Sequence, residues 1–162
     1  MSDLPEVPTA GGEPVKPRSA QLLTFFLDNQ EYGVDILRVQ EIRGWSAPMP
    51  IPGAPPYIKG VINIRGDVVP IADLRERLSL PALEYGATTA VVVLRVRYKN
   101  RDRIMGVVVD AMSDVTTVPG EALKPPPTFH DSTESLAKEI ATLEDKMITI
   151  LDVDRVFGDQ AA

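Results

Sequence analysis

Residues 60–74 read GVINIRGDVVPIADL, a pattern of two apolar segments around a glycine. Two apolar arms rich in β-branched residues, 61–64 and 68–71, flank the tripeptide Arg65–Gly66–Asp67. Glycine supplies the backbone geometry that a tight reversal requires, so the stretch predicts a β-hairpin. Because the hairpin is the clearest local signal in the chain, it favours an all-β fold.

Two further stretches follow the same hairpin pattern. In QLLTFFLDNQEYGV, residues 21–34, apolar side chains alternate along the first arm and return after a turn at 29–30. In a later stretch, arms at 90–98 and 104–109 flank a polar tip at 99–103. The sequence therefore predicts three hairpins.

Helix is expected only in short pieces. Five prolines between 48 and 56 argue against a long helix there, because proline lacks the amide that a helix needs. Short helical segments are predicted at 73–78, where Asp73 can cap the first turn, within 132–140 and near Asp154.

An internal repeat in the sequence indicates how these elements are arranged. GVDILRVQEI, from Gly33, aligns with GVVVDAMSDV, from Gly106, and VVPIADLRERL, from Val68, aligns with MITILDVDRVF, from Met147. Apolar positions coincide in both alignments, and the two matches occur in the same order. We infer two related units of short antiparallel strands, each closed by a helical turn. Small barrels are one way for such strands to avoid exposed edges.

The chain is accordingly divided into four parts. A flexible tail is expected at 1–20, because ordering so few apolar residues costs conformational entropy with little burial in return. The two barrel units are expected at 21–84 and 85–158, with an exchange of strands between them left open. A short C-terminal tail is expected at 159–162.

The formal net charge of −6 is concentrated near the C-terminus, where residues 131–162 carry eight acidic and three basic side chains. Nucleic acids and anionic membranes both favour concentrated Lys and Arg, so neither is expected as a partner. The chain has no cysteine, and no stretch resembles a signal peptide or a membrane span. We expect a cytoplasmic protein that does not insert into a membrane.

Residues with the pattern of a catalytic, metal or cofactor site are missing from the sequence. The single histidine, His130, follows three prolines in an expected loop, where a lone imidazole is usually solvated. Asp131, Glu134 and Glu139 could offer oxygens to a hard cation, but they lack the spacing of a calcium loop. Phosphate-cradling and common hydrolase motifs are missing too. We predict a protein that is not an enzyme and uses no metal or cofactor.

A basic stretch carries five cations on alternate positions: Arg95, Arg97, Lys99, Arg101 and Arg103. On one continuous strand this alternation would place all five on a single outward face. Such a face is typical of a solvated sheet edge that charge protects from aggregation. Contact with an acidic partner or with lipid headgroups is the functional alternative.

Three blocks of the chain resemble CheW-type chemotaxis coupling proteins. They are EYGVDILRVQEIRGW at 31–45, YIKGVINIRGDVVPIADLR at 57–75 and MGVVVDAMSDV at 105–115. The resemblance spans roughly 21–157 in order, although the basic hairpin at 95–103 looks longer than expected of the family. It implies two five-stranded SH3-like antiparallel barrels packed side by side, with short helical turns.

The resemblance also implies a role as a non-catalytic adaptor. Such proteins bind the cytoplasmic tip of methyl-accepting chemotaxis receptors in the cleft between the barrels, and they pair with the regulatory domain of the kinase CheA. It assigns no residue to CheA contact. Carried over position by position, the receptor-facing candidates are Val39, Glu41, Gly60, Arg65, Gly66 and Val115.

Each candidate has a structural alternative. Arg65, the strongest candidate, could instead form an ion pair with Glu41, and the glycines could matter only for backbone geometry. The two valines fit a core as well as an apolar groove. A coupling role in twitching motility or developmental signalling, rather than chemotaxis, is also left open.

Overall fold

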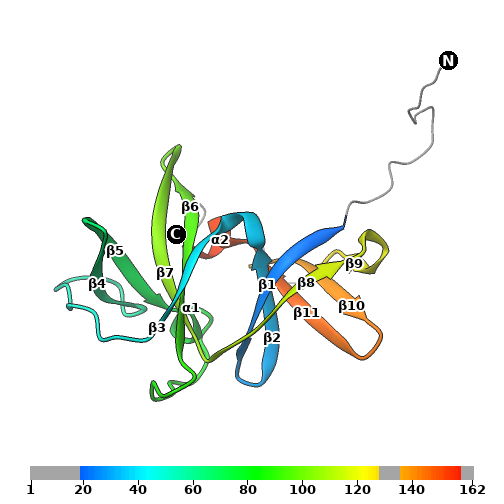
Figure 1. Cartoon of the computed structure of the whole chain (residues 1–162), viewed down its shortest axis with the longest axis horizontal. Helices are drawn as coiled ribbons and strands as arrows, with labels where there is room; N and C mark the ends of the chain where they lie inside the picture. The colour runs from blue at the N-terminus through cyan, green and yellow to red at the C-terminus, as the bar shows by residue number, and fades with distance from the viewer. Residues whose placement is uncertain (1–18, 128–135, 158–162) are drawn as a thin grey trace.

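The computed structural model describes residues 19–127 and 136–157, which form two sheets lying side by side (Figure 1). Sheet A has the order β8-β1-β2-β11-β10-β9 and sheet B the order β3-β6-β7-β5-β4. Sheet A contains β1 (Ala20–Leu27), β2 (Gln30–Asp35), β8 (Ala111–Val118), β9 (Leu123–Lys124), β10 (Ala137–Leu143) and β11 (Lys146–Leu151). Sheet B contains β3 (Val39–Gly44), β4 (Ile58–Ile64), β5 (Asp67–Asp73), β6 (Ala90–Tyr98) and β7 (Arg101–Val109). The all-β fold with two curled, barrel-like halves is as predicted.

The three predicted hairpins are confirmed as β1–β2, β4–β5 and β6–β7. Each reverses over two residues with positive φ: Asp28–Asn29, Arg65–Gly66 and Lys99–Asn100. Positive φ at both positions matches the right-handed twist of the flanking strands. The first turn therefore comes one residue earlier than predicted. The third tip is shorter than predicted, because β7 already begins at Arg101.

The expectation that the cations of 95–103 share one face is wrong. The chain reverses at Lys99–Asn100, and Tyr98 pairs directly with Arg101. Directly paired residues of an antiparallel ladder point to the same face, so Arg101 lies on the face of Tyr98 and opposite to Arg97. The arginines before the turn and those after it therefore lie on opposite faces of the hairpin.

Each sheet takes strands from both sides of residue 84. After β2 in sheet A, the chain passes through the 3-10 turn η1 (Ile36–Arg38) into β3 of sheet B. After β7 in sheet B, it passes into β8 of sheet A. The hairpin β1–β2 is thus completed by strands from the second half of the chain, and β6–β7 by strands from the first half.

The register confirms the internal repeat. Gly33 pairs in parallel with Ile150, and Gly106 pairs in parallel with Ile71. These are the same residues that the two sequence alignments match with one another. At Gly106 a Cβ would lie 2.5 Å from the side chain of Ile71 and 2.9 Å from that of Val91, so the packing of these buried side chains leaves little room for a side chain there.

Two short α-helices close the two units. Asp73 caps α1 (Leu74–Arg77) as predicted, its carboxylate accepting from the amide of Arg75. The predicted turn near Asp154 is α2 (Val153–Phe157), and a second 3-10 turn, η2 (Gly120–Ala122), precedes β9. The helix expected within 132–140 is wrong from Ala137 onward, because that segment pairs with β11 as strand β10. Its earlier part, 132–135, lies outside the described residues, as do 1–18 and 159–162 of the expected tails. The expected N-terminal tail of 1–20 is one residue too long, because Ala20 already belongs to β1.

Three apolar clusters hold the sheets together. One lies within sheet B around Ile71, a second within sheet A around Ile148, and the largest between the sheets around Phe25 and Leu94. β1 and β6 supply residues to the central cluster from one face and to their own sheet from the other, which explains their nearly continuous apolar sequence. Each such large buried side chain contributes roughly 1.5–3 kcal/mol.

Candidate functional site

An ion-pair cluster joins the two outer strands of sheet B. Nη2 of Arg65, in the β4–β5 turn, lies 2.6 Å from Oε1 of Glu41 on β3. Nη1 of Arg43, two residues further along β3, lies 2.8 Å from Oε2 of the same carboxylate. The Arg65 side chain is 73% exposed and that of Glu41 19%. Glu41 is therefore an anchor that holds two exposed guanidinium groups at this edge.

The electrostatics of the cluster favour the charged form of the Glu41 carboxylate. Hydrogen bonds from Arg43 and then from Arg65 lower the pKa of Glu41. The ion pair between Glu41 and Arg65, one of the two alternatives for these residues, is thus present. It leaves the question of partner contact open, because Arg65 is still largely exposed.

The β4–β5 turn holds Arg65 in an uncommon backbone conformation. Its φ is +51° and that of Gly66 is +91°, and the amide of Gly66 donates to the side chain of Asn63 at 3.0 Å. Asn, Asp or Gly usually occupies the first of these positions. A large side chain kept in the left-handed region is a common sign of a functional position.

Gly60 lies in a different environment from the exposed turn. It is buried in β4 with φ of +145°, and a Cβ there would lie 2.2 Å from the backbone oxygen of Met49. Met49 in turn forms an isolated bridge with Val61. The structure therefore gives Gly60 a backbone role, since any side chain would separate the segment around Met49 from β4.

The two candidate valines lie in different sheets. Val39 begins β3, pairs with Leu94 and packs half-buried against the central cluster. Val115 is exposed on β8 of sheet A, paired with Leu23. The structure thus gathers Glu41, Arg65 and Gly66 at the β3 and β4–β5 edge of sheet B, and it places Val115 on the other sheet.

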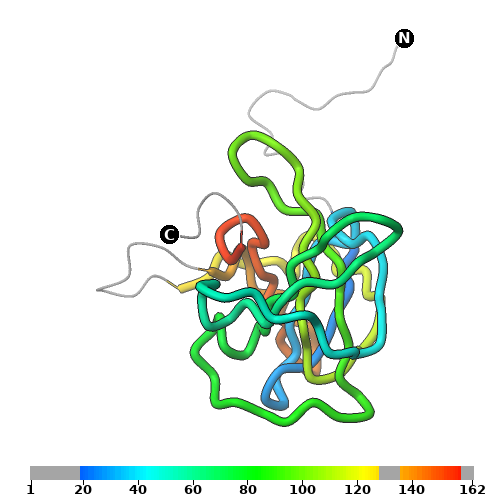
Figure 2. The backbone as a smooth tube through the Cα atoms, turned by 90° about the vertical axis from the view of Figure 1, so that its left-hand side faces the viewer, coloured from blue at the N-terminus to red at the C-terminus, as the bar shows by residue number. Residues whose placement is uncertain are grey.

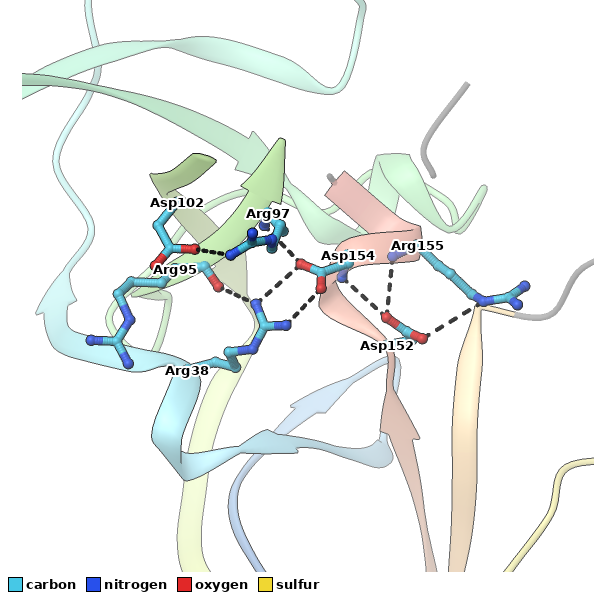
Figure 3. A network of polar contacts seen from close by, with 7 residues as sticks. All are labelled: Arg38, Arg95, Arg97, Asp102, Asp152, Asp154 and Arg155. Atoms are coloured by element: carbon cyan, nitrogen blue, oxygen red, sulfur yellow. Dashed lines mark hydrogen bonds and ion pairs between the residues drawn. The ribbon is translucent and has the colours of Figure 1, made fainter. Parts of the chain in front are cut away.

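A second polar network, shown in Figure 3, joins η1 and β6 of sheet B to α2. Nη2 of Arg38 donates to Oδ2 of Asp154 at 2.6 Å, and its Nη1 donates to Oδ1 at 3.1 Å and to the backbone oxygen of Arg95 at 2.8 Å. The backbone amide of Arg97 donates to Oδ1 of Asp154 at 2.8 Å. Asp152 accepts from the first amides of α2 and so fixes the position of Asp154.

This network continues the sheet where the pairing of β3 with β6 stops, at the first residue of β3. β3 pairs with β6 as far as Leu94. Beyond that point the Arg38 side chain donates to the backbone oxygen of Arg95, and the Asp154 side chain accepts from the backbone amide of Arg97. Burial alone would raise the pKa of Asp154, but hydrogen bonds from Arg38 and from the Arg97 backbone outweigh it and lower that pKa. We call Arg38 and Asp154 the α2 junction.

A third network lies at the equivalent place beside α1. Nη1 of Arg75 lies 2.6 Å from Asp110 and its Nη2 3.5 Å from Asp28, while its Nε donates to the backbone oxygen of Pro81. The amide of Asp28 also donates to Asp110 at 2.8 Å. We call Arg75, Asp28 and Asp110 the α1 junction.

Sequence reasoning missed both junctions. A signal was present, because the repeat aligns Arg75 with Asp154, two opposite charges at equivalent places in the two helices. What the alignment could not supply was the partners, since Arg38 and Asp154 are 116 residues apart. The proximity of such residues follows from the strand exchange.

The described parts of the chain, 19–127 and 136–157, contain no group of three His, Asp or Glu side chains placed to hold a metal ion. His130, Asp131 and Glu134 lie outside them, and Glu139 is half-buried in β10. In the same ranges, no helix is long and apolar enough to cross a membrane.

The fold and these sites define a class, a small β-scaffold of two interlaced sheets tied together by ion pairs at their edges and junctions. Within that class, the chain belongs to the CheW-like domain family, whose family model matches residues 21–161.

Similar proteins agree with this membership. Chemotaxis protein CheW of Rhizobium meliloti is 38% identical over 86% of this chain and 88% of its own length. The protein of the same name from Klebsiella aerogenes is 37% identical over 99% of this chain and 93% of its own. The crystal structure of the scaffolding protein TtCheW from Thermoanaerobacter tengcongensis matches with a TM-score of 0.76 and 27% identity, covering 87% of this chain and 92% of that one.

Proposed function

We propose that this protein is a non-catalytic scaffold that couples the kinase CheA to the cytoplasmic tips of methyl-accepting chemoreceptors in bacterial chemotaxis. The family match across residues 21–161 carries the proposal. It is supported by relatives named as chemotaxis proteins and by a solved neighbour named as a scaffolding protein. On this proposal the protein works in the cytoplasm and reaches membrane receptor arrays through its partners.

Arg65 is the proposed centre of the receptor contact. Its guanidinium is largely exposed, while Glu41 on β3, the strand at the other end of sheet B, holds it in place. A guanidinium suits forked hydrogen bonds with a carboxylate or with backbone carbonyls, such as those at the end of a receptor helix. Holding the side chain in advance reduces the conformational entropy lost when a partner binds.

The other candidates take supporting roles in this proposal. Gly66 allows the turn that presents Arg65, and Gly60 keeps the segment around Met49 against β4. Val39 supports the start of β3 from the central cluster. Val115 offers an exposed apolar side chain on β8, which suits the apolar face of an amphipathic receptor helix.

Coupling requires more than simultaneous binding. A scaffold transmits receptor state only when its affinity differs between the states of its partners, because equal affinity shifts no equilibrium. We therefore expect kinase activity in the assembled complex, and not the binding of CheA alone, to depend on the receptor-facing residues.

The test assembles receptor signalling fragments, CheA and this protein, and measures co-sedimentation together with kinase activity. We expect Arg65→Ala to weaken receptor association by about tenfold or more, since it removes a charge-assisted contact. CheA binding and the melting temperature should stay close to those of the parent protein. Alanine and arginine are equally strained at positive φ, so this substitution changes the side chain without changing the turn.

The matched control is Arg43→Ala, which removes the other partner of Glu41 and leaves the β4–β5 turn intact. It should weaken receptor association much less than Arg65→Ala. Receptor association and kinase activity that stay unchanged in Arg65→Ala, with the protein folded, would falsify the role given to Arg65. Loss of CheA binding in the same variant would place the kinase, and not the receptor, at this edge.

A further inference from the structure

One corner of sheet B is open where the corresponding corner of sheet A is closed. In sheet B the parallel pairing of β5 with β7 begins at Ile71 and Gly106, whereas in sheet A the pairing of β11 with β2 begins one equivalent position earlier, at Thr149 and Tyr32. Beside the earlier residues of both strands lies a groove of about 470 Å³. Its lining includes Val68, Pro70, Tyr98, Ile104, Met105 and Phe157. We call it the corner groove.

The equivalent corner of sheet A carries an ion pair. Lys146, at the start of β11, lies 3.1 Å from Glu31 on β2, and the hydroxyl of Ser113 donates to the same carboxylate at 3.0 Å. The repeat matches Lys146 with Asp67 and Glu31 with Ile104. Asp67 and Ile104 both line the corner groove. The charge pair that joins β2 to β11 is therefore replaced in sheet B by an acidic residue and an apolar one.

The hairpin beside the corner groove is also longer than its counterpart. Leu27–Gln30 is the last pair of β1–β2, and the equivalent pair of β6–β7 is followed by Arg97–Asp102 and Tyr98–Arg101. Figure 2 shows this hairpin reaching beyond the body of the molecule. Sheet A forms without such an extension, so the fold itself does not require the two extra pairs.

The extension places an aromatic ring and cations beside apolar surface. Tyr98 is partly exposed, and the guanidinium of Arg103 lies 5.7 Å from its ring centroid. Arg101 is exposed on the same face, since it pairs with Tyr98. Across the corner groove, Val68 is 68% exposed. Tyrosine and arginine beside a small apolar groove are typical of the centres of protein interfaces.

We propose that the corner groove binds an acidic segment of a partner protein through one apolar side chain. The apolar side chain enters the groove beside Val68 and Tyr98, and flanking carboxylates pair with Arg101 and Arg103. A flat anionic membrane fits less well, because Asp67 and Asp102 also line the groove and would approach it. A peptide can place its carboxylates at the arginines alone. This surface goes beyond the proposed function, and it uses neither Arg65 nor Glu41.

The test uses the full chain and a fluorescent peptide of about ten Glu and Ser residues with one central Leu, followed by anisotropy at about 0.1 M salt, where exposed charges are partly screened. We expect saturable binding. Replacing the Leu by Ser should weaken binding by about tenfold, given the free energy of burying a leucine. Replacing the Glu residues by Lys should abolish it.

Two variants and a matched control locate the contact. The double reversal Arg101→Glu with Arg103→Glu and the single change Val68→Asp should each weaken peptide binding by about tenfold or more. Met147→Asp alters the residue equivalent to Val68, which is 66% exposed in sheet A, and should leave binding unchanged.

Three outcomes would overturn the proposal. Peptide binding that survives the double reversal, or that falls equally in Met147→Asp, excludes the corner groove as the site. Absence of peptide binding, together with sedimentation on phosphatidylglycerol vesicles that depends on Arg101 and Arg103, would show that these two arginines contact a membrane surface instead.

Discussion

The α1 and α2 junctions occupy equivalent places in the two units, yet their charges are reversed. In the α1 junction the helix supplies the cation, Arg75, to two aspartates, whereas in the α2 junction it supplies the anion, Asp154, to Arg38. The Arg75 side chain is 8% exposed and that of Arg38 is 32% exposed. Both units therefore have an ion pair at the equivalent position, but the charge that the helix supplies and the burial of the arginine differ.

The difference in burial predicts different contributions of the two junctions to the stability of the fold. A buried cation that loses its partners is costly, and so are buried carboxylates that lose their cation. A half-exposed pair contributes less, because water screens it and can replace it. We expect the α1 junction to set the stability of the whole fold. The α2 junction should act mainly on the protruding part of β6, whose backbone it contacts.

The largest effect is expected at the α1 junction. Arg75→Met keeps an apolar stem of similar length but leaves Asp110 without its cation, so unfolding free energy should fall by about 3 kcal/mol. Urea denaturation followed by circular dichroism measures it. A loss no greater than that of Arg38→Ala would show that burial does not distinguish the two junctions.

A smaller effect is expected at the α2 junction. Arg38→Ala removes hydrogen bonds to Asp154 and to the Arg95 backbone, so it should cost about 1–2 kcal/mol of unfolding free energy. A double-mutant cycle with Asp154→Ala isolates the coupling between the two side chains. Arg97→Gln serves as a control, because its pair with Asp102 is long and exposed, and it should change stability by less than about 0.5 kcal/mol. A coupling energy of zero would mean that the pair does not stabilise the fold.

The smallest effect is expected in the pH dependence of stability. The folded pKa of Asp154 lies below its ordinary value, so its contribution is complete above the unfolded pKa of about 3.9 and is lost as pH falls through the folded pKa. Asp154→Asn should therefore lose stability less steeply than the parent protein below about pH 4. Glu31 and Glu41 also have lowered pKa values, so only the difference between the two proteins reports on Asp154. Parallel pH profiles would contradict the assignment.

Local elements of the fold were predictable from sequence because their causes are local. The three hairpins and the cap at Asp73 depend on neighbouring residues, and the repeat was visible as matching apolar positions. Strand partners were not predictable, because an apolar strand such as β1 can pair with many others. The true neighbour of β1 in the second unit, β8, is chosen by packing across the whole molecule.

In the candidate site, too, the features with local causes were predictable and those that depend on distant contacts were not. Glu41 and Arg65 were both named as candidates because each stands in a recognisable block, and the ion pair that was considered as their structural alternative is present. The basic hairpin failed for a specific reason, since a two-residue turn at Lys99–Asn100 changes which face later residues occupy. A polar tip at 99–103 was predicted from the sequence, and a tip of that length does not reveal the change of face. The junction partners were missed because their contacts cross the strand exchange.

The reciprocal crossing of β3 and β8 has a consequence for how this chain folds. Neither sheet can be completed from one half of the sequence, so the halves must form together as one cooperative unit. Contacts such as Thr24 with Asp114, 90 residues apart, also give a high contact order and hence slow folding. Cut between residues 84 and 85, the chain would yield two fragments that each lack a complete sheet. They would regain structure only by assembling as an intertwined heterodimer.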